Sequence, residues 1–163
     1  MSTTMDRPRA QTDRGNELLS IRLGGQEFAI SIMAIREIRG WITSTPLPHA
    51  PLYIKGMINL RGTVLAIVDL AVRLGLPNRE PTQASVVVVV ELGDKAVGLL
   101  VDAVSDIIAV TEDMRQGTPD TGETVSRSYI ESVIMIDQRI IGILSLPAVI
   151  PQEQIMKLDL QMA

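Results

Sequence analysis

The sequence lacks several residues and patterns on which other protein classes depend. It contains no cysteine, so disulfides and thiolate chemistry are excluded, which suits the reducing cytoplasm where we expect the protein to act. Its aromatic residues are limited to Phe28, Trp41, Tyr53 and Tyr129, and its net charge is −4. Nucleic-acid binding is therefore not expected, because it needs basic surfaces and aromatic stacking platforms.

Long apolar runs are also missing. The valines at positions 86–90 form a run of five residues, whereas a membrane-spanning helix needs about 20. Residues 1–16 are mostly polar and contain no apolar signal region, so they are expected to form a disordered tail. The sequence thus gives no sign of direct insertion into a membrane.

Catalytic and metal-binding patterns are absent as well. The single histidine, His49, lies among prolines with no nucleophile motif nearby, so a histidine in a surface loop is the simpler interpretation. The carboxylates of Asp69, Asp102 and Asp106 match no known calcium-loop spacing, and no glycine pattern suits phosphate binding. We therefore expect a binding protein rather than an enzyme, with no cofactor and no metal.

The most informative pattern that is present is an internal repeat. Residues 53–70 resemble residues 129–146 at a constant offset of 76 (129 − 53), and both segments begin with Tyr-Ile. Residues 23–38 resemble residues 92–107 at an offset of 69 (92 − 23). Two equivalent halves imply a seam between them, and such seams are common binding sites.

Both halves are rich in β-branched residues and short alternating segments, and the helical period is nearly absent. The pattern predicts strands at 18–24, 27–32, 35–40, 54–60, 63–69, 85–92, 96–102, 104–110, 130–136 and 139–145. Five short, evenly spaced strands per half favour an all-β protein of two small packed barrels, because closure removes exposed sheet edges.

The repeat suggests a first barrel at residues 17–80 and a second at 81–163, with segments free to cross between them because each half is small. Asp69 is expected to cap a short helix over residues 70–74. After Pro151, the spacing of Ile155, Leu158 and Met162 predicts a short amphipathic helix at the C-terminus.

Apolar residues at a spacing of three occur at matching positions of the two halves. They are Ile32, Ile35 and Ile38 in the first half, and Val101, Val104 and Ile107 in the second. This spacing breaks strand alternation and predicts a bend or a short helical turn. The residues can form core, or some can line the seam, where an Ile- and Val-lined groove suits the apolar face of a partner's helix.

Polar side chains accompany these positions. The segment IREIRG at 35–40 alternates charged with apolar residues, and Arg61 occupies the tip of a predicted hairpin. Both fit an ordinary solvated surface, although arginine is also well suited to anchoring a partner beside an apolar groove.

In combination, these segments resemble the CheW family of bacterial chemotaxis coupling proteins. The resemblance runs from about Leu18 to the C-terminal helix. It is carried by IREIRG at 35–40, PLYIKGMINLRG at 51–62, IVDL at 67–70, LG at 92–93 and VGLLVDAV at 97–104. Many ordered matches at the expected separations are more specific than any single motif.

The resemblance implies two intertwined five-stranded SH3-like barrels. It also implies a cytoplasmic adaptor, recruited to membrane receptor arrays, that binds the regulatory domain of the histidine kinase CheA and the helical tips of methyl-accepting receptors. If the family's binding residues are transferred to the matching positions of this sequence, the receptor groove is bordered by Ile32, Ile35, Val101 and Val104. Glu37 and Arg61 would then be its polar anchors. The strand end at Val86 and Val88 would meet the kinase.

Other interpretations are a regulatory-domain-like scaffold, a coupling protein fused to a receiver domain, and a small-ligand sensor using the groove between the barrels. The chain shows no ATP-binding or phosphotransfer region and no acidic receiver after residue 150, which disfavours the first two.

Overall fold

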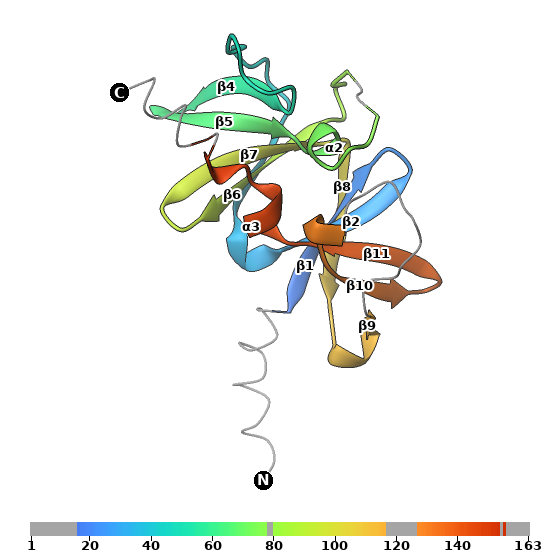
Figure 1. The fold of residues 1–163 in the computed structure, drawn as a ribbon. Coiled ribbons are helices and arrows are strands. Elements are labelled where there is room, and N and C mark those ends of the chain that lie inside the picture. The colour runs from blue at the N-terminus through green and yellow to red at the C-terminus, as the bar shows by residue number, and fades with distance from the viewer. Residues whose placement is uncertain (1–15, 78–79, 117–126, 154, 156–163) are drawn as a thin grey trace.

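The computed structural model describes residues 16–77, 80–116, 127–153 and 155, and its regular structure is mostly β (Figure 1). One sheet has six strands in the order β8-β1-β2-β11-β10-β9. These strands are β1 (Glu17–Leu23), β2 (Gln26–Ser31), β8 (Ala103–Ala109), β9 (Arg115–Gln116), β10 (Ile130–Ile136) and β11 (Arg139–Leu144). The second sheet has the order β3-β6-β7-β5-β4. It contains β3 (Ile35–Gly40), β4 (Ile54–Leu60), β5 (Thr63–Asp69), β6 (Val86–Leu92) and β7 (Lys95–Val101).

The two sheets have equivalent strand orders, but each combines strands from both sequence repeats. Under the repeat, β1 and β2 correspond to β6 and β7, yet β1 and β2 lie in the sheet of β8 to β11, and β6 and β7 lie in the sheet of β3 to β5. The two hairpins are therefore exchanged between the halves. The boundary at residue 80 divides the sequence repeat and not the sheets, because all strands of the five-stranded sheet fall between Ile35 and Val101.

The chain passes between the sheets at two short links. The first is the 3₁₀ turn η2 (Ile32–Ala34), capped by the Ser31 hydroxyl, which accepts a hydrogen bond from the backbone N–H of Met33 at 3.2 Å. The second is a bend at Asp102, between β7 and β8. The apolar spacing of three predicted a break in alternation at these places, and each link has one.

The predicted strands all form, with ends that differ by no more than a residue or so from the sequence-based ranges. The expectation of five strands per barrel holds for one sheet, whereas the other gains β9, a strand of two residues. β9 pairs with β10 where Gln116 faces Val133, and the five-stranded sheet has an isolated bridge between Thr45 and Met57 at the equivalent place. Such short pairings leave no alternating pattern to recognise.

Three apolar clusters fill the molecule. The largest takes residues from both sheets, including Leu19, Val68, Leu99 and Leu144, and is the shared core between them. Each sheet also has a smaller cluster of its own. The sheets therefore bury side chains on both faces, as expected for two packed barrels.

The valine run shows how this double burial is encoded. β6 lies between β3 and β7, so it is paired on both sides. Val88 and Val90 point into the shared core, whereas Val87 and Val89 point into the cluster of the five-stranded sheet. A strand buried on both faces reads as a continuous apolar run.

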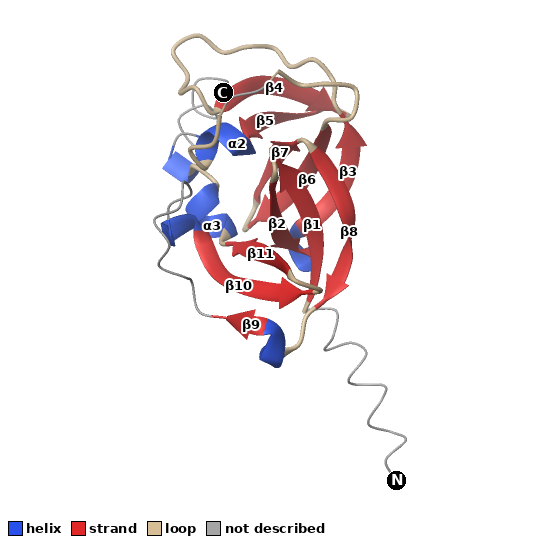
Figure 2. Cartoon of the chain, turned by 90° about the vertical axis from the view of Figure 1, so that its right-hand side faces the viewer, coloured by secondary structure: helices blue, strands red, loops and turns tan. Residues whose placement is uncertain are grey.

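The two short α-helices that follow β5 and β11 lie on one side of the molecule, away from β3 and β8 (Figure 2). The predicted helix after Asp69 is confirmed as α2 (Leu70–Arg73), and the Asp69 carboxylate accepts a hydrogen bond from the backbone N–H of Val72 at 3.4 Å. α3 (Leu146–Val149) follows β11 at the equivalent position, and its first residue is preceded by Ser145, which makes no side-chain cap. Of the predicted C-terminal helix, residues 152, 153 and 155 are helical, and positions 158 and 162 lie outside the described residues, as does most of the 1–16 tail. No helix in the described part of the chain is long and apolar enough to cross a membrane.

Candidate functional site

The structure places the apolar residues expected at the seam on or within the shared core. Ile32, Ile35 and Val104 are half-buried and pack against the shared core. Val101 belongs to that core and is 1% exposed, so its side chain supports the seam from beneath and does not line its surface. The reason is that Val101 ends β7 with its side chain directed between the sheets.

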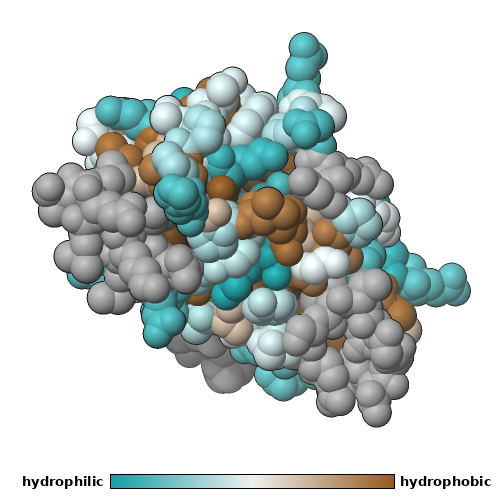
Figure 3. Space-filling model, turned by 45° about the horizontal axis from the view of Figure 1, so that its top comes forward, coloured by the Kyte–Doolittle hydropathy of each residue, from teal (hydrophilic) through white to brown (hydrophobic). Residues whose placement is uncertain are grey.

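Two further isoleucines are exposed beside these residues. Ile38 on β3 is 46% exposed, and its repeat equivalent Ile107 on β8 is 60% exposed. Both belong to the spacing-of-three pattern, but they are not among the predicted site residues. Their exposure could have been expected from the charged or polar residues that neighbour them on the same edge strand. Met33, in the link η2, is exposed as well. On the face shown in Figure 3, apolar surface occurs as separate patches among polar residues.

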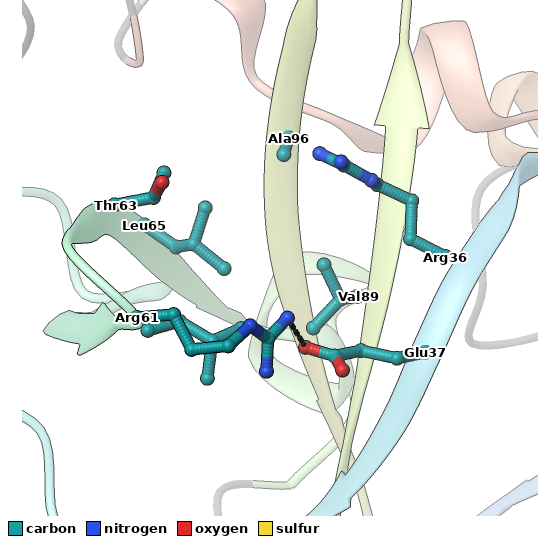
Figure 4. Close-up of a pocket in the computed structure, with 8 residues that line it drawn as sticks. Arg36, Glu37, Arg61, Thr63, Leu65, Val89 and Ala96 are labelled. Atoms are coloured by element: carbon teal, nitrogen blue, oxygen red, sulfur yellow. Dashed lines mark hydrogen bonds and ion pairs between the residues drawn. The ribbon is translucent and has the colours of Figure 1, made fainter.

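Arg61 and Glu37, both expected to be polar anchors, form an ion pair with each other. Arg61 Nη2 donates to Glu37 Oε2 at 2.9 Å, with the arginine side chain 68% exposed and the glutamate 26% (Figure 4). Their elements are the β4–β5 turn and the edge strand β3, which lie toward opposite edges of the five-stranded sheet, so the sheet curls enough for side chains from the two regions to touch.

The turn that presents Arg61 is tight. Arg61 and Gly62 have φ values of 52° and 86°, the consecutive left-handed residues of a type I′ hairpin turn. The side-chain oxygen of Asn59 accepts a hydrogen bond from the backbone N–H of Gly62 at 2.9 Å. The Arg61 side chain is thus held at the open end of the curled sheet.

A pocket of about 290 Å³ opens beneath the ion pair. It is lined by Arg36, Glu37, Leu60, Arg61, Thr63, Leu65, Val89 and Ala96. Figure 4 shows the charged side chains at its rim.

The internal repeat allows this pocket to be compared with the other sheet. The positions of Val89 and Ala96 correspond to Ser20 and Glu27 at an offset of 69, and Thr63 corresponds to Arg139 at an offset of 76. In the six-stranded sheet, Ser20 Oγ donates to Glu27 Oε2 at 2.6 Å, and Arg139 Nε lies 3.8 Å from Glu27 Oε1. The six-stranded sheet therefore has a hydrogen bond and an ion pair at this place, where the five-stranded sheet has Val89, Ala96 and Thr63, which carry no charge.

The residues expected to meet a kinase differ in exposure. Val86, at the start of β6, is half-buried, whereas Val88 is fully buried in the shared core. Val88 therefore has no side-chain surface to offer a partner, because the interior of β6 is covered by apolar clusters on both faces. Val86 keeps part of its surface at the strand end.

Titratable groups give no sign of catalysis. Burial raises the pKa of the Asp69 carboxyl, opposed by its hydrogen bond from Val72 and by Lys55, whose Nζ lies 4.0 Å away. Asp69 is 5% exposed and is occupied as the cap of α2. In the part of the chain that the structure describes, no cluster of acidic or histidine side chains could hold a metal ion.

Comparison with known proteins decides the family. The CheW-like domain model matches residues 17–154. The chain belongs to the CheW family. The chemotaxis protein CheW of Rhizobium meliloti is 49% identical over 143 residues, which is 88% of this chain and 92% of that protein. CheW of Bacillus subtilis is 31% identical over 144 residues, covering 88% and 92% of the two chains.

A solved structure of the family agrees with the fold. The scaffolding protein TtCheW from Thermoanaerobacter tengcongensis has a TM-score of 0.75 and 27% sequence identity, over 81% of this chain and 90% of the other. CheW proteins are non-catalytic scaffolds of chemotaxis, so the expected family, fold class and absence of an enzymatic role are confirmed.

Proposed function

We propose that this CheW-family chain couples methyl-accepting chemotaxis receptors to the histidine kinase CheA in the cytoplasm, by binding each at a separate surface. Membrane association would then come from the receptor and not from the chain itself. The observation that carries the proposal is a half-buried apolar seam that includes Ile35 of the edge strand β3, together with an exposed ion pair between Arg61 and Glu37 of the same strand.

The receptor surface is the seam. A receptor tip is helical, and an amphipathic helix binds through apolar side chains laid into a groove. Ile32, Ile35 and Val104 offer such side chains, and the nearby Ile38 and Ile107 extend the apolar surface along β3 and β8.

Glu37 and Arg61 serve as polar anchors for the same partner. Their ion pair is exposed on the arginine side, so Arg61 can donate further hydrogen bonds without leaving Glu37. The open pocket beneath them gives this end of the five-stranded sheet a recess, and at the equivalent place the six-stranded sheet has the charged side chains of Glu27 and Arg139.

The kinase surface is the end of β6 at Val86. This residue keeps accessible apolar surface, and the regulatory domain of the kinase would pack against it. In an array, many copies raise the effective concentration, so weak contacts at each surface gain on the order of 10²–10⁴-fold.

The test is a three-component titration. The purified protein is titrated with a receptor-tip fragment, with the kinase regulatory domain, and with both together. We expect each to bind and a ternary complex to form. Competition between the two partners, or no binding to either, would contradict the proposal.

A variant at the seam checks the assignment of surfaces. Ile35→Glu places a charge at the half-buried edge of the groove and is expected to weaken receptor binding while kinase binding persists. Arg22→Ala, at an exposed arginine on β1, is the matched control and should change neither.

A further inference from the structure

On the helix side of the molecule, Arg73 at the end of α2 lies between two aromatic rings. Its guanidinium carbon is 4.7 Å from the ring centre of Tyr53 and 5.4 Å from that of Tyr129. Both distances are within the range of cation–π attraction. The two tyrosines are equivalent under the repeat, since 129 − 53 is the offset of 76.

Each tyrosine is fixed to a different sheet. The carbonyl of Tyr53 accepts a hydrogen bond from the N–H of Asp69, at the end of β5, at 2.7 Å. The carbonyl of Tyr129 accepts one from the N–H of Ser145, just after β11, at 2.9 Å. Arg73 therefore contacts one ring carried by the five-stranded sheet and one carried by the six-stranded sheet.

The same guanidinium is bonded to the second short helix. Arg73 Nε donates to the carbonyl of Val149 at 2.7 Å, and Nη2 donates to the carbonyl of Ala148 at 3.4 Å. Val149 is itself the repeat equivalent of Arg73 (73 + 76), so one arginine serves both halves at this point. A second arginine at position 149 would place two like charges together.

Apolar packing and polar contacts both act in this region, because α2 and α3 bury Leu70, Ala71, Leu146 and Val149 in the shared core. A cavity of about 350 Å³ borders Arg73, with Tyr53, Pro147, Pro151 and Gln152 among its lining residues. In addition to this apolar packing, the two hydrogen bonds of the planar guanidinium constrain the orientation of α2 relative to α3.

We propose that Arg73 is a positioning residue that sets the angle between the two sheets, and thereby the width of the seam on the opposite side. α2 and α3 lie on one side, and β3 and β8 lie on the other (Figure 2). The shared core joins them, so a rotation at the helices changes the spacing of the half-buried seam residues. The occupant of the seam is that of the proposed function, but the effect on sheet angle does not depend on it.

The first experiment measures the sheet angle with no partner present. Val64 on β5 and Ile140 on β11 are repeat equivalents in different sheets, 42% and 63% exposed. Since the chain has no cysteine, Val64→Cys and Ile140→Cys accept two nitroxide labels and no others. We expect a narrow distribution of label–label distances, and a broader or shifted one when Arg73→Met is added.

Matched variants distinguish the effect of losing the guanidinium contacts from the effect of a general loss of stability. Arg73→Lys keeps the charge but cannot donate to two carbonyls from one plane, so an intermediate broadening is expected. Tyr129→Phe keeps the ring and should leave the distribution unchanged. If Arg73→Met does not fold, Arg73→Lys carries the test. A folded Arg73 variant with the wild-type distribution would overturn the proposal.

The second experiment measures whether a substitution at Arg73 changes binding at the seam. Arg73→Met is expected to reduce affinity for the receptor-tip fragment by roughly 2- to 30-fold, although Arg73 is remote from the seam. Changed distances with unchanged affinity would overturn the link to the seam. If the wild-type protein does not bind the fragment, the proposed function fails, and the distance measurement still decides the role of Arg73.

Discussion

At the hairpin tip, Arg61 combines high exposure with a fixed position, which separates its contribution to binding from its contribution to folding. Its pair with Glu37 is largely in solvent, where such pairs stabilise a protein by about 0–1 kcal/mol. We predict that Arg61→Ala changes the free energy of unfolding by no more than about 0.5 kcal/mol. Affinity for the receptor fragment should fall about tenfold, the loss of one charged hydrogen bond.

Calorimetry of binding and chemical denaturation measure the two effects on the same samples. Arg22→Ala serves as the control for removing an exposed arginine elsewhere. Wild-type affinity in a folded Arg61→Ala protein would remove Arg61 from the receptor surface.

Asp69 gives the protein a dependence of stability on pH. Burial raises its pKa above the ordinary 3.8, so the folded state keeps a proton that the unfolded state has already lost. The stabilisation from this proton is complete below pH 3.8 and is lost as pH rises through the raised pKa.

Asp69→Asn should remove this part of the pH dependence, because asparagine caps a helix as well as aspartate and does not ionise. As pH rises from below 3.8, the free energy of unfolding of the variant is therefore expected to increase relative to that of the wild type. This difference in stability should become constant above the raised pKa. Asp69→Ala loses the cap and should cost about 1 kcal/mol. Urea denaturation across the pH range measures the free energy of unfolding of each protein. A difference between wild type and Asp69→Asn that does not change with pH would refute the role of Asp69.

Among the elements, β6 has both a residue in the core, Val88, and a half-buried residue at its end, Val86. Val88→Glu buries a charge in the shared core and should prevent folding or destabilise the protein by several kcal/mol. Val86→Glu, at the half-buried strand end, should leave a folded protein with weaker affinity for the kinase regulatory domain. Circular dichroism and a pull-down distinguish the two variants. Unfolding of Val86→Glu would show that its side chain belongs to the core.

Much of the element pattern was readable from the sequence, because alternation and turn residues are local. The two-residue β9 was not, since so short a pairing has no period of its own. The difference between Val86 and Val88 was hidden too: both valines lie on the same face of β6 and differ only in their distance from the strand end, which the valine run does not reveal. The ion pair between Glu37 and Arg61 depends on the curling of a sheet across 24 residues, which a local pattern does not encode.

For the whole molecule, the exchanged hairpins predict that neither repeat folds by itself. A fragment of residues 1–79 holds β1 and β2 without β8 and β11, and β3 and β5 without β6 and β7. Unpaired apolar strand edges of this kind aggregate or remain unfolded. We expect the fragments 1–79 and 80–163 to lack native structure separately and to recover the spectrum of the intact protein when mixed.

Heteronuclear NMR of one labelled fragment, with and without the other, gives the measurement. Each fragment mixed with unlabelled copies of itself is the control. A stable, monomeric fold for residues 1–79 alone would mean that β1 and β2 can return to their own half.

The route of the chain also decides how genes of this type can recombine. All strands of the five-stranded sheet fall between Ile35 and Val101, so a chimera that takes this span from a relative keeps every ladder within a sheet intact. A crossover at the midpoint of the repeat, near residue 80, would instead assemble both sheets from two parents. Exchange at the two links is therefore the more permissive way to transplant one surface of this scaffold onto another.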